Sequence, residues 1–153
     1  MTIARLVTSV AITVCCLIST AAAPAEIAHS AKPVITVYKD PSCGCCKNWI
    51  EHLLKHGFRV NAKDSPDMSG VKRTLGIPER LQSCHTAVVG GYLIEGHVPA
   101  ADIDRLLAQK PKIRGLAVPG MPMGSPGMEG RTRESFTVLA FDGTGKTQVF
   151  ARH

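Results

Sequence analysis

Three thiols lie within four positions of this chain, in the run Cys43-Gly44-Cys45-Cys46. Cys43 and Cys46 form a C-x-x-C pair, the spacing of a thiol–disulfide redox site, for which two thiols suffice. The third thiol, Cys45, favours a site that holds a soft metal, because thiolates select Cu(I), zinc and iron–sulfur centres over hard ions. The chemistry expected at this run is therefore soft-metal binding, with disulfide exchange as the alternative.

The residues on either side of this run predict a strand before it and a helix after it. Val34–Tyr38 is a β-branched apolar run typical of a buried strand. From 45 to 56 apolar residues recur at helical spacing, and Gly57 follows as the expected end of the helix. Cys45 and Cys46 are thus expected in the first helical turn, where unpaired N–H groups and the helix dipole stabilise a thiolate.

The remainder of the chain alternates between strand and helix patterns. Strands are expected at 58–62, 86–89 and 92–94, with Gly90-Gly91 as the hairpin turn between the last two. Helices are expected at 67–75 and 100–109, and a second hairpin of 136–141 with 147–150. Residues 113–130 hold five glycines, three prolines and three methionines, and we expect them to form an irregular loop.

This order of elements is that of a thioredoxin or glutaredoxin domain. We therefore predict a thioredoxin-like α/β fold over residues 34–153: a central mixed sheet flanked by helices, with an added C-terminal β-hairpin. In those families the turn before the third strand packs against the thiol loop, usually with a cis-proline. Here that turn is Ser83-Cys84-His85-Thr86, so the fold would bring a fourth thiol and a histidine to the first three thiols.

Residues 1–25 are expected to be a signal peptide that is removed. Arg5 supplies a positive charge, an apolar run too short to span a bilayer comfortably follows, and small residues precede a cleavage site after Ala25. Cys15 and Cys16 would leave with this peptide, and residues 26–33 would form a flexible leader. This predicts a periplasmic protein without a membrane anchor after cleavage; a retained N-terminal anchor is the alternative.

The remaining 128 residues (153 − 25) predict one domain, which is large enough to bury a hydrophobic core without stabilising disulfides. The whole chain carries a net charge of +6. Its basic residues are scattered and its aromatic residues are few, so we expect no nucleic-acid partner. Three of the four remaining cysteines are crowded together, which fits a reactive or metal-bound cluster better than a framework of structural disulfides.

Three segments of the chain resemble the CopG-type family of exported copper-resistance proteins. They are Tyr38–Trp49, Ser83–Thr86 and the glycine- and proline-rich stretch 115–129. The resemblance covers about residues 33–151, and it implies a thioredoxin-like fold, a periplasmic location and copper bound by cysteines. Carried over position by position, it implies the ligands Cys43, Cys45, Cys46 and Cys84.

Copper also suits the electrostatics of four thiolates in one small pocket. These thiolates repel one another, and several Cu(I) ions that share bridging sulfurs would neutralise their charge. We therefore predict a polynuclear Cu(I)–thiolate cluster. A single tetrahedral zinc ion is the main alternative, although three thiols from one tight loop close a tetrahedron awkwardly. The cysteine spacing matches none of the common iron–sulfur patterns.

Residues outside the thiols could also contact the metal. His85 adjoins Cys84 and could bind Cu(II) directly, or it could contact the metal-binding side chains and tune the site without binding the metal. Alternatively, it is a hydrogen-bonded residue in the place of the cis-proline. Three methionines in the predicted loop carry soft thioethers, which could bind copper or fill gaps between elements. These are Met121, Met123 and Met128.

Other histidines are assigned no role in the site. His97 follows a predicted strand and is expected to be a turn residue. His52 and His56 are expected on a solvated face of the first helix, and His153 at the terminus is expected to be silent. Trp49, on the same helix, is expected in the core.

The function that we predict is exported copper binding for copper resistance or homeostasis. The protein would sequester copper, pass it to other periplasmic copper-handling proteins, or cycle it between Cu(I) and Cu(II), which would make it a copper oxidoreductase. One alternative is a thiol–disulfide oxidoreductase in which Cys43 attacks and Cys46 resolves, although the extra thiols and the missing cis-proline count against it. Another is a zinc-stabilised interaction module.

Overall fold

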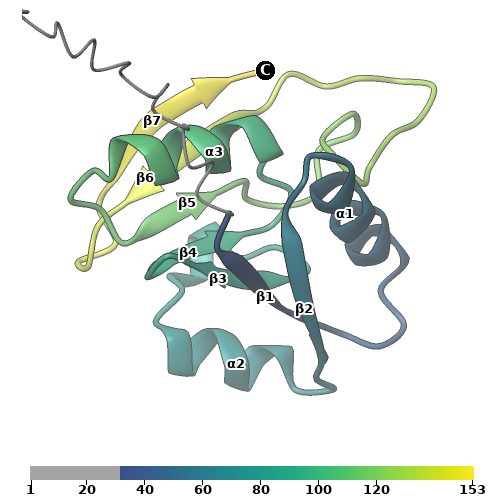
Figure 1. Ribbon diagram of the computed structural model, residues 1–153, viewed down its shortest axis with the longest axis horizontal. Coiled ribbons are helices and arrows are strands. Elements are labelled where there is room, and N and C mark those ends of the chain that lie inside the picture. The colour runs from purple at the N-terminus through teal and green to yellow at the C-terminus, as the bar shows by residue number, and fades with distance from the viewer. Residues whose placement is uncertain (1–31) are drawn as a thin grey trace, which may run out of the picture. The chain divides into compact units, whose positions relative to one another are not determined.

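The computed structural model describes residues 32–153; the predicted signal peptide and most of the predicted leader lie outside the described residues (Figure 1). The strands are β1 (Val34–Lys39), β2 (Arg59–Asp64), β3 (Thr86–Val89), β4 (Tyr92–Glu95), β5 (Gly115–Ala117), β6 (Thr137–Phe141) and β7 (Thr147–Arg152). The helices are α1 (Gly44–Lys55), α2 (Met68–Leu75) and α3 (Ala100–Gln109), with one short 3-10 turn, η1 (Glu79–Leu81).

All seven strands form one mixed sheet in the order β2-β1-β3-β4-β5-β6-β7. β1 pairs with β2, and β4 with β5, in parallel, whereas the other neighbours are antiparallel. The predicted α/β class, the mixed sheet flanked by helices and the C-terminal hairpin (β6 and β7) are confirmed.

The prediction of an irregular loop over 113–130 was wrong at β5. This strand has only three residues, all buried, so it shows no alternation of polar and apolar residues that a sequence pattern could reveal. Gly115 permits the pairing, because a Cβ atom there would lie 2.0 Å from the carbonyl oxygen of Leu93 in β4. The rest of the predicted loop, after Ala117, has no regular secondary structure as far as β6.

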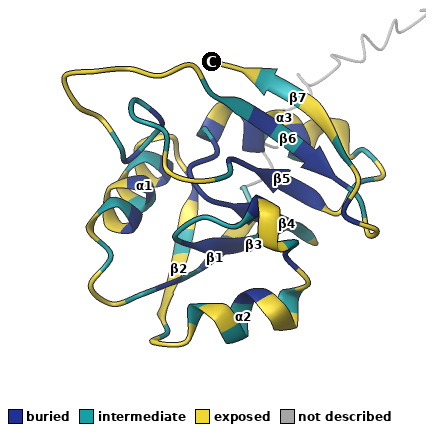
Figure 2. Cartoon of the chain, turned by 180° about the vertical axis from the view of Figure 1, so that it is seen from behind, coloured by how far each residue is buried: buried dark blue, intermediate teal, exposed yellow. Residues whose placement is uncertain are grey.

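The helices lie on opposite faces of the sheet, α1 and α3 on one and α2 on the other (Figure 1). One apolar cluster joins Trp49 of α1 and Ile103 of α3 to Ile35 of β1, each of which is fully buried. A second cluster, on the α2 side, joins Leu81 of η1 to Phe141 of β6. The predicted core position of Trp49 is confirmed, and the exposed residues concentrate at the sheet edges and outer helix faces (Figure 2).

Helix α1 begins at the thiol run. Cys43 is its N-cap residue, and its sulfur accepts the backbone N–H of Cys46 at 3.3 Å. Cys45 and Cys46 therefore lie in the first turn, as predicted. The indole N–H of Trp49 donates to the carbonyl of Val98 at 2.9 Å, which anchors α1 to the segment that precedes α3.

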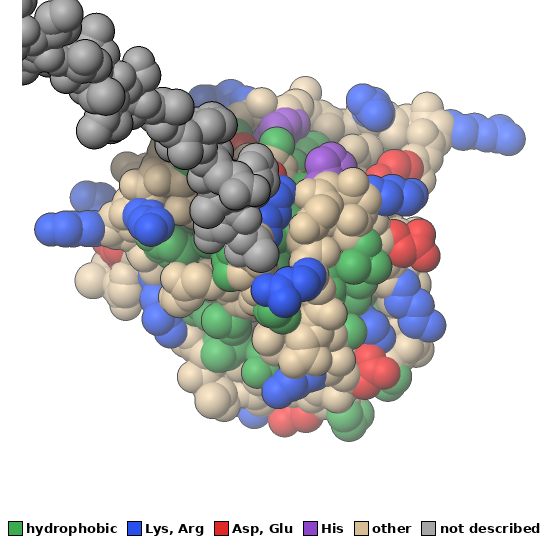
Figure 3. All heavy atoms as spheres, viewed as in Figure 1, with side chains coloured by type: hydrophobic (Ala, Val, Ile, Leu, Met, Phe, Trp, Pro, Cys, Tyr) green, Lys and Arg blue, Asp and Glu red, His purple; other side chains and the backbone are tan. Residues whose placement is uncertain are grey.

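In the part of the chain that the structure describes, no helix combines the length and apolar character that crossing a bilayer requires. On the face shown in Figure 3, Lys and Arg side chains are spread among acidic and uncharged ones. The positive charge of the chain thus forms no single patch on that face.

Candidate metal centre

The sulfur atoms of Cys43, Cys45, Cys46 and Cys84 all lie within 4.8 Å of one another. Cys45 Sγ is 3.5 Å from Cys43 Sγ and 3.7 Å from Cys84 Sγ, although Cys84 lies 39 positions after Cys45 in the sequence. The sheet brings them together, because β1 and β3 are antiparallel neighbours. The thiol run that follows β1 and the turn that precedes β3 therefore meet at the same end of these strands.

Two of these four sulfurs are joined. Cys43 and Cys46 form a disulfide, whereas Cys45 and Cys84 are free thiols with partly exposed side chains. This is the pairing that the oxidoreductase alternative requires. Only two thiols are available to a metal in this form, and all four become available when the disulfide accepts two electrons.

Two histidines flank the Cys84 sulfur. Nδ1 of His85 lies 3.2 Å from it and Nε2 of His97 lies 3.0 Å from it, so Cys84, His85 and His97 make a second group of potential ligands. His97 does lie in the bend after β4, but its side chain is fully buried, and its place at the site was missed. Its Nδ1 lies 2.7 Å from the carbonyl oxygen of Pro126. Because that oxygen only accepts, Nδ1 carries the proton and Nε2 presents its lone pair to Cys84.

The environment keeps both imidazoles neutral. Burial lowers the pKa of His85 well below its usual value, and neighbouring His97 and Lys72 lower it further. Burial also lowers the pKa of His97. His85 packs on Trp49 with ring centroids 4.3 Å apart, and its buried Nε2 has no hydrogen-bond partner among the described residues. Neutral rings with available nitrogens are the form that binds a metal.

Cys84 is held as a neutral thiol in the absence of a metal. Burial, followed by the charge of and the hydrogen bond to neighbouring Cys45, raises the pKa of Cys84 to about 12. A metal that binds this sulfur must therefore displace its proton.

The three methionines lie on the long loop between β5 and β6, which passes beside α1 (Figure 1). Met121 is 53% exposed, the terminal methyl group of Met123 lies against Gly130, and the backbone N–H of Met128 donates to the Ser125 carbonyl. The loop reaches the thiol run through its backbone: a Cβ atom at Gly127 would lie 2.7 Å from the Cys45 carbonyl oxygen. Copper contact by the thioethers stays a prediction.

The remaining histidines have structural contacts. His56 is exposed, as predicted, but His52 is half-buried and its Nε2 accepts the backbone N–H of Ala100 at 3.1 Å. That bond ties α1 to the first residue of α3. His153, expected to be silent, places Nε2 2.7 Å from a carboxylate oxygen of Asp102 in α3.

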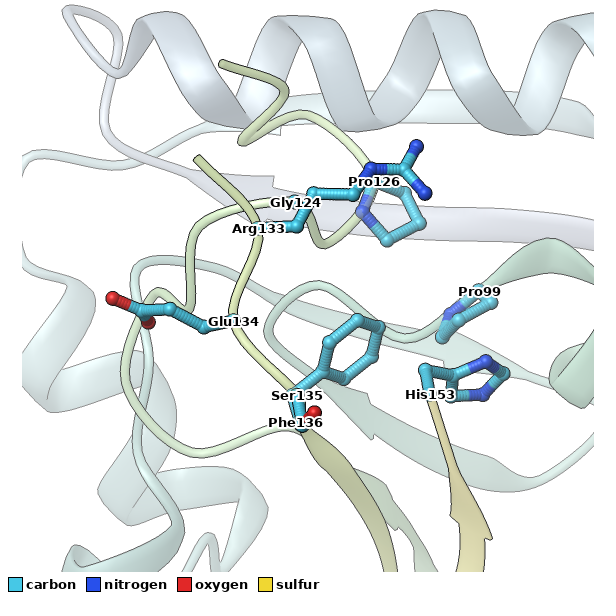
Figure 4. Close-up of a pocket in the computed structure, with 8 residues that line it drawn as sticks. All are labelled: Pro99, Gly124, Pro126, Arg133, Glu134, Ser135, Phe136 and His153. Carbon is cyan, nitrogen blue, oxygen red and sulfur yellow. The ribbon is translucent and has the colours of Figure 1, made fainter. Parts of the chain in front are cut away.

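A cavity of about 370 Å³ lies near the C-terminal residue (Figure 4). It is lined by Pro99, Gly124, Pro126, Arg133, Glu134, Ser135, Phe136 and His153. Its lining includes none of the four cysteines, so it is distinct from the thiol cluster. Pro126 joins the two regions, because it lines the cavity and its carbonyl accepts the hydrogen bond from His97.

Comparison with known proteins places this arrangement in a family. Two solved structures of copper resistance protein CopG, in form 1 and form 2, match with TM-scores of 0.75 and 0.76, 46% sequence identity, and coverage of 80% of this chain and 98% of theirs. The chain belongs to the CopG family of copper resistance proteins. A family described as protein of unknown function, DUF411, also matches residues 81–128, and a comparison with curated proteins gives no match. The CopG-type resemblance of the sequence is thereby confirmed.

Proposed function

We propose that this protein binds copper in copper resistance, with Cys43, Cys45, Cys46 and Cys84 as its ligands. The observation that carries the proposal is the convergence of their four sulfur atoms within 4.8 Å. Two sulfurs on one ion, each at about 2.3 Å, lie at most about 4.6 Å apart. The distances of 3.5 and 3.7 Å from Cys45 to its two neighbours fit that limit. Membership of the CopG family supports copper as the metal.

The form that we propose is a polynuclear Cu(I)–thiolate cluster in the reduced protein. Several Cu(I) ions that share sulfurs offset the mutual repulsion of four thiolates, and soft sulfur ligands favour this metal. His85 and His97 add two neutral nitrogen ligands at Cys84, which would suit Cu(II) if the site cycles copper between valences.

Loading such a cluster requires the disulfide to be opened first. The Cys43–Cys46 bond accepts two electrons and two protons from a dithiol reductant, which becomes a disulfide itself. Cu(I) then displaces the thiol protons as the copper–sulfur bonds form.

We further propose that the protein is exported to the periplasm by residues 1–25 and exchanges copper there with other copper-handling proteins. Fractionation of cells, with mass spectrometry of the mature N-terminus, tests this. An uncut chain, or one confined to the cytoplasm, would contradict it.

The decisive test of copper binding is the copper content of anaerobically reduced protein loaded with Cu(I). We expect more than one copper ion per chain in the wild type. We expect fewer ions in Cys84→Ser, because this variant lacks the sulfur that the turn before β3 contributes. His56→Gln, at an exposed position, is the control. A ceiling of one ion in the wild type rules out the cluster, and the absence of tight binding rules out the proposed function.

The Cys43–Cys46 disulfide specifically favours one second candidate, a thiol–disulfide oxidoreductase. Insulin reduction separates the two. Copper binding predicts slow turnover without metal, whereas fast, metal-independent turnover that is lost in Cys43→Ser would establish the oxidoreductase.

A further inference from the structure

A buried ion pair lies under the turn that carries Cys84. Lys72 of α2 is 4% exposed and Glu95 of β4 is fully buried, and Lys72 Nζ lies 2.5 Å from Glu95 Oε1. Burying two charges is costly, and replacing such a pair with apolar residues is often neutral or stabilising. Stability alone is therefore a weak reason for a carboxylate at this position.

The contacts of the Glu95 carboxylate extend to both ends of the turn. Oε1 accepts the backbone N–H of Ser83 at 2.7 Å, and Oε2 accepts the hydroxyl of Thr86 at 2.6 Å. Lys72 also donates to the Thr86 hydroxyl at 2.9 Å. The residues between these two attachment points are Cys84 and His85, the two potential ligands of this segment.

The ordinary alternative is that the pair merely holds α2 against the sheet. An apolar pair of similar size would do that equally well, but it would offer no acceptor to the Ser83 N–H. No cis peptide bond occurs within residues 32–153, so a cis-proline does not shape this turn. The carboxylate accepts the Ser83 backbone N–H before Cys84 and the Thr86 side-chain hydroxyl after it.

We propose that Glu95 is a positioning residue that, by accepting the Ser83 N–H, holds the Cys84 sulfur within reach of Cys45. Lys72 and Thr86 in turn hold the carboxylate. The importance of this role for copper rests on the proposed function, because a displaced Cys84 would separate one sulfur from the other three. The positioning itself concerns the distance of 3.7 Å between the Cys45 and Cys84 sulfurs, so it can be tested without copper.

Two double variants separate positioning from packing. Lys72→Met with Glu95→Gln removes the ion pair but keeps an amide oxygen for the Ser83 N–H. Lys72→Met with Glu95→Leu removes both. The measurement is the rate at which diamide, a two-electron oxidant, joins Cys45 to Cys84, with the linked peptides identified by mass spectrometry in metal-free protein. This bond forms as two electrons and two protons pass from the thiols to the diamide.

We expect the Gln variant to react within about threefold of the wild-type rate and the Leu variant to react about tenfold or more slowly, since loss of alignment reduces effective concentration. Equal rates in both variants, whether fast or slow, would overturn the proposal. If the Leu variant does not fold, Thr86→Val supplies the test. That variant removes one support of the carboxylate, and an unchanged rate there would also overturn it.

Copper loading of the same variants distinguishes the positioning role of Glu95 from the proposed copper binding. If wild-type protein binds no copper, the proposed function fails while the rate comparison still decides the role of Glu95. If it binds copper, we expect the Leu variant to lose as many ions as Cys84→Ser and the Gln variant to retain them. Full loading of a folded Leu variant would overturn the positioning role at the metal site.

Discussion

Cys84 is the residue that two groups of potential ligands share. It faces Cys45 on one side and the nitrogens of His85 and His97 on the other. The same burial that raises its thiol pKa to about 12 lowers the pKa of both imidazoles. Cys84, His85 and His97 are therefore neutral without a metal.

His97 is the histidine whose substitution tests this arrangement best. His97→Gln removes the lone pair that faces Cys84, while its amide can still donate to the Pro126 carbonyl. We expect copper affinity to fall about 10- to 100-fold, the usual effect of removing a group that supports a ligand. Competition with a chromophoric Cu(I) chelator measures this affinity. His56→Gln, at an exposed histidine, is the control, and equal affinities in the two variants would exclude His97 from the site.

At the scale of elements, three segments build the candidate centre. The N-terminus of α1 supplies three sulfurs, the turn before β3 supplies the fourth, and the bend after β4 supplies His97. The loop between β5 and β6 contacts α1 directly with its backbone at Gly127, and its Pro126 carbonyl accepts the hydrogen bond from His97. Gly127 makes that approach possible, because it has φ +88° and its missing Cβ atom would meet Cys45 O and Trp49 N within 2.8 Å.

Gly127→Ala should therefore separate the loop from α1 or strain both. We expect the free energy of unfolding to fall by about 1–3 kcal/mol, the usual cost of a side chain in this backbone region. Denaturant unfolding measures the change. Gly143→Ala is the control, because its Cβ atom would meet no atom within 4 Å, and we expect a change of less than about 0.5 kcal/mol there. Similar losses in the two variants would contradict close packing of the loop.

For the whole molecule, the contact of α1 with α3 links stability to pH through His52. Its Nε2 can accept the Ala100 N–H only when the ring is neutral. Burial lowers its pKa below the ordinary value of 6.5; the nearby His56 and Lys55 lower it further, whereas Glu129 opposes the shift. Because the pKa is lower in the folded protein, this contribution is complete above about pH 6.5 and is lost as the pH falls through the folded value.

We expect wild-type protein to exceed His52→Ala in free energy of unfolding by about 1 kcal/mol at pH 8, the usual net contribution of one hydrogen bond, and by less at pH 5. Urea unfolding at the two pH values measures the difference. A difference between wild type and His52→Ala that does not change with pH would show that the hydrogen bond plays no part.

Much of the architecture could be predicted because local patterns encode it. The apolar run before Cys43 predicts β1, the spacing of Trp49 and Leu53 predicts α1, and the paired glycines after Val89 predict the β3–β4 hairpin. These features depend on backbone preference and on the burial of one face, both of which a short window of residues reveals. β5 lies outside that reach, because three buried residues form no pattern.

Such local patterns could predict only part of the candidate metal site. The hairpin register pairs Thr86 with Glu95, and its continuation sets Cys84 opposite His97, so a count along the predicted hairpin could have revealed this histidine. The contacts of Glu95 with Lys72 and with the Ser83 N–H offered no such signal, since the Glu95 side chain reaches a helix and a turn residue with which β4 does not pair.

The sequence by itself determined that three thiols lie within four positions at the start of a helix, where the helix dipole places a partial positive charge. The position of Cys84 beside these thiols and the neutral imidazoles around it depended on the folded sheet, whereas the Cys43–Cys46 disulfide follows the local C-x-x-C spacing. The reason is that β3, rather than another strand, must pair with the edge of β1 that faces away from β2. That choice depends on the packing of every strand and helix at once, which no short stretch of the chain contains.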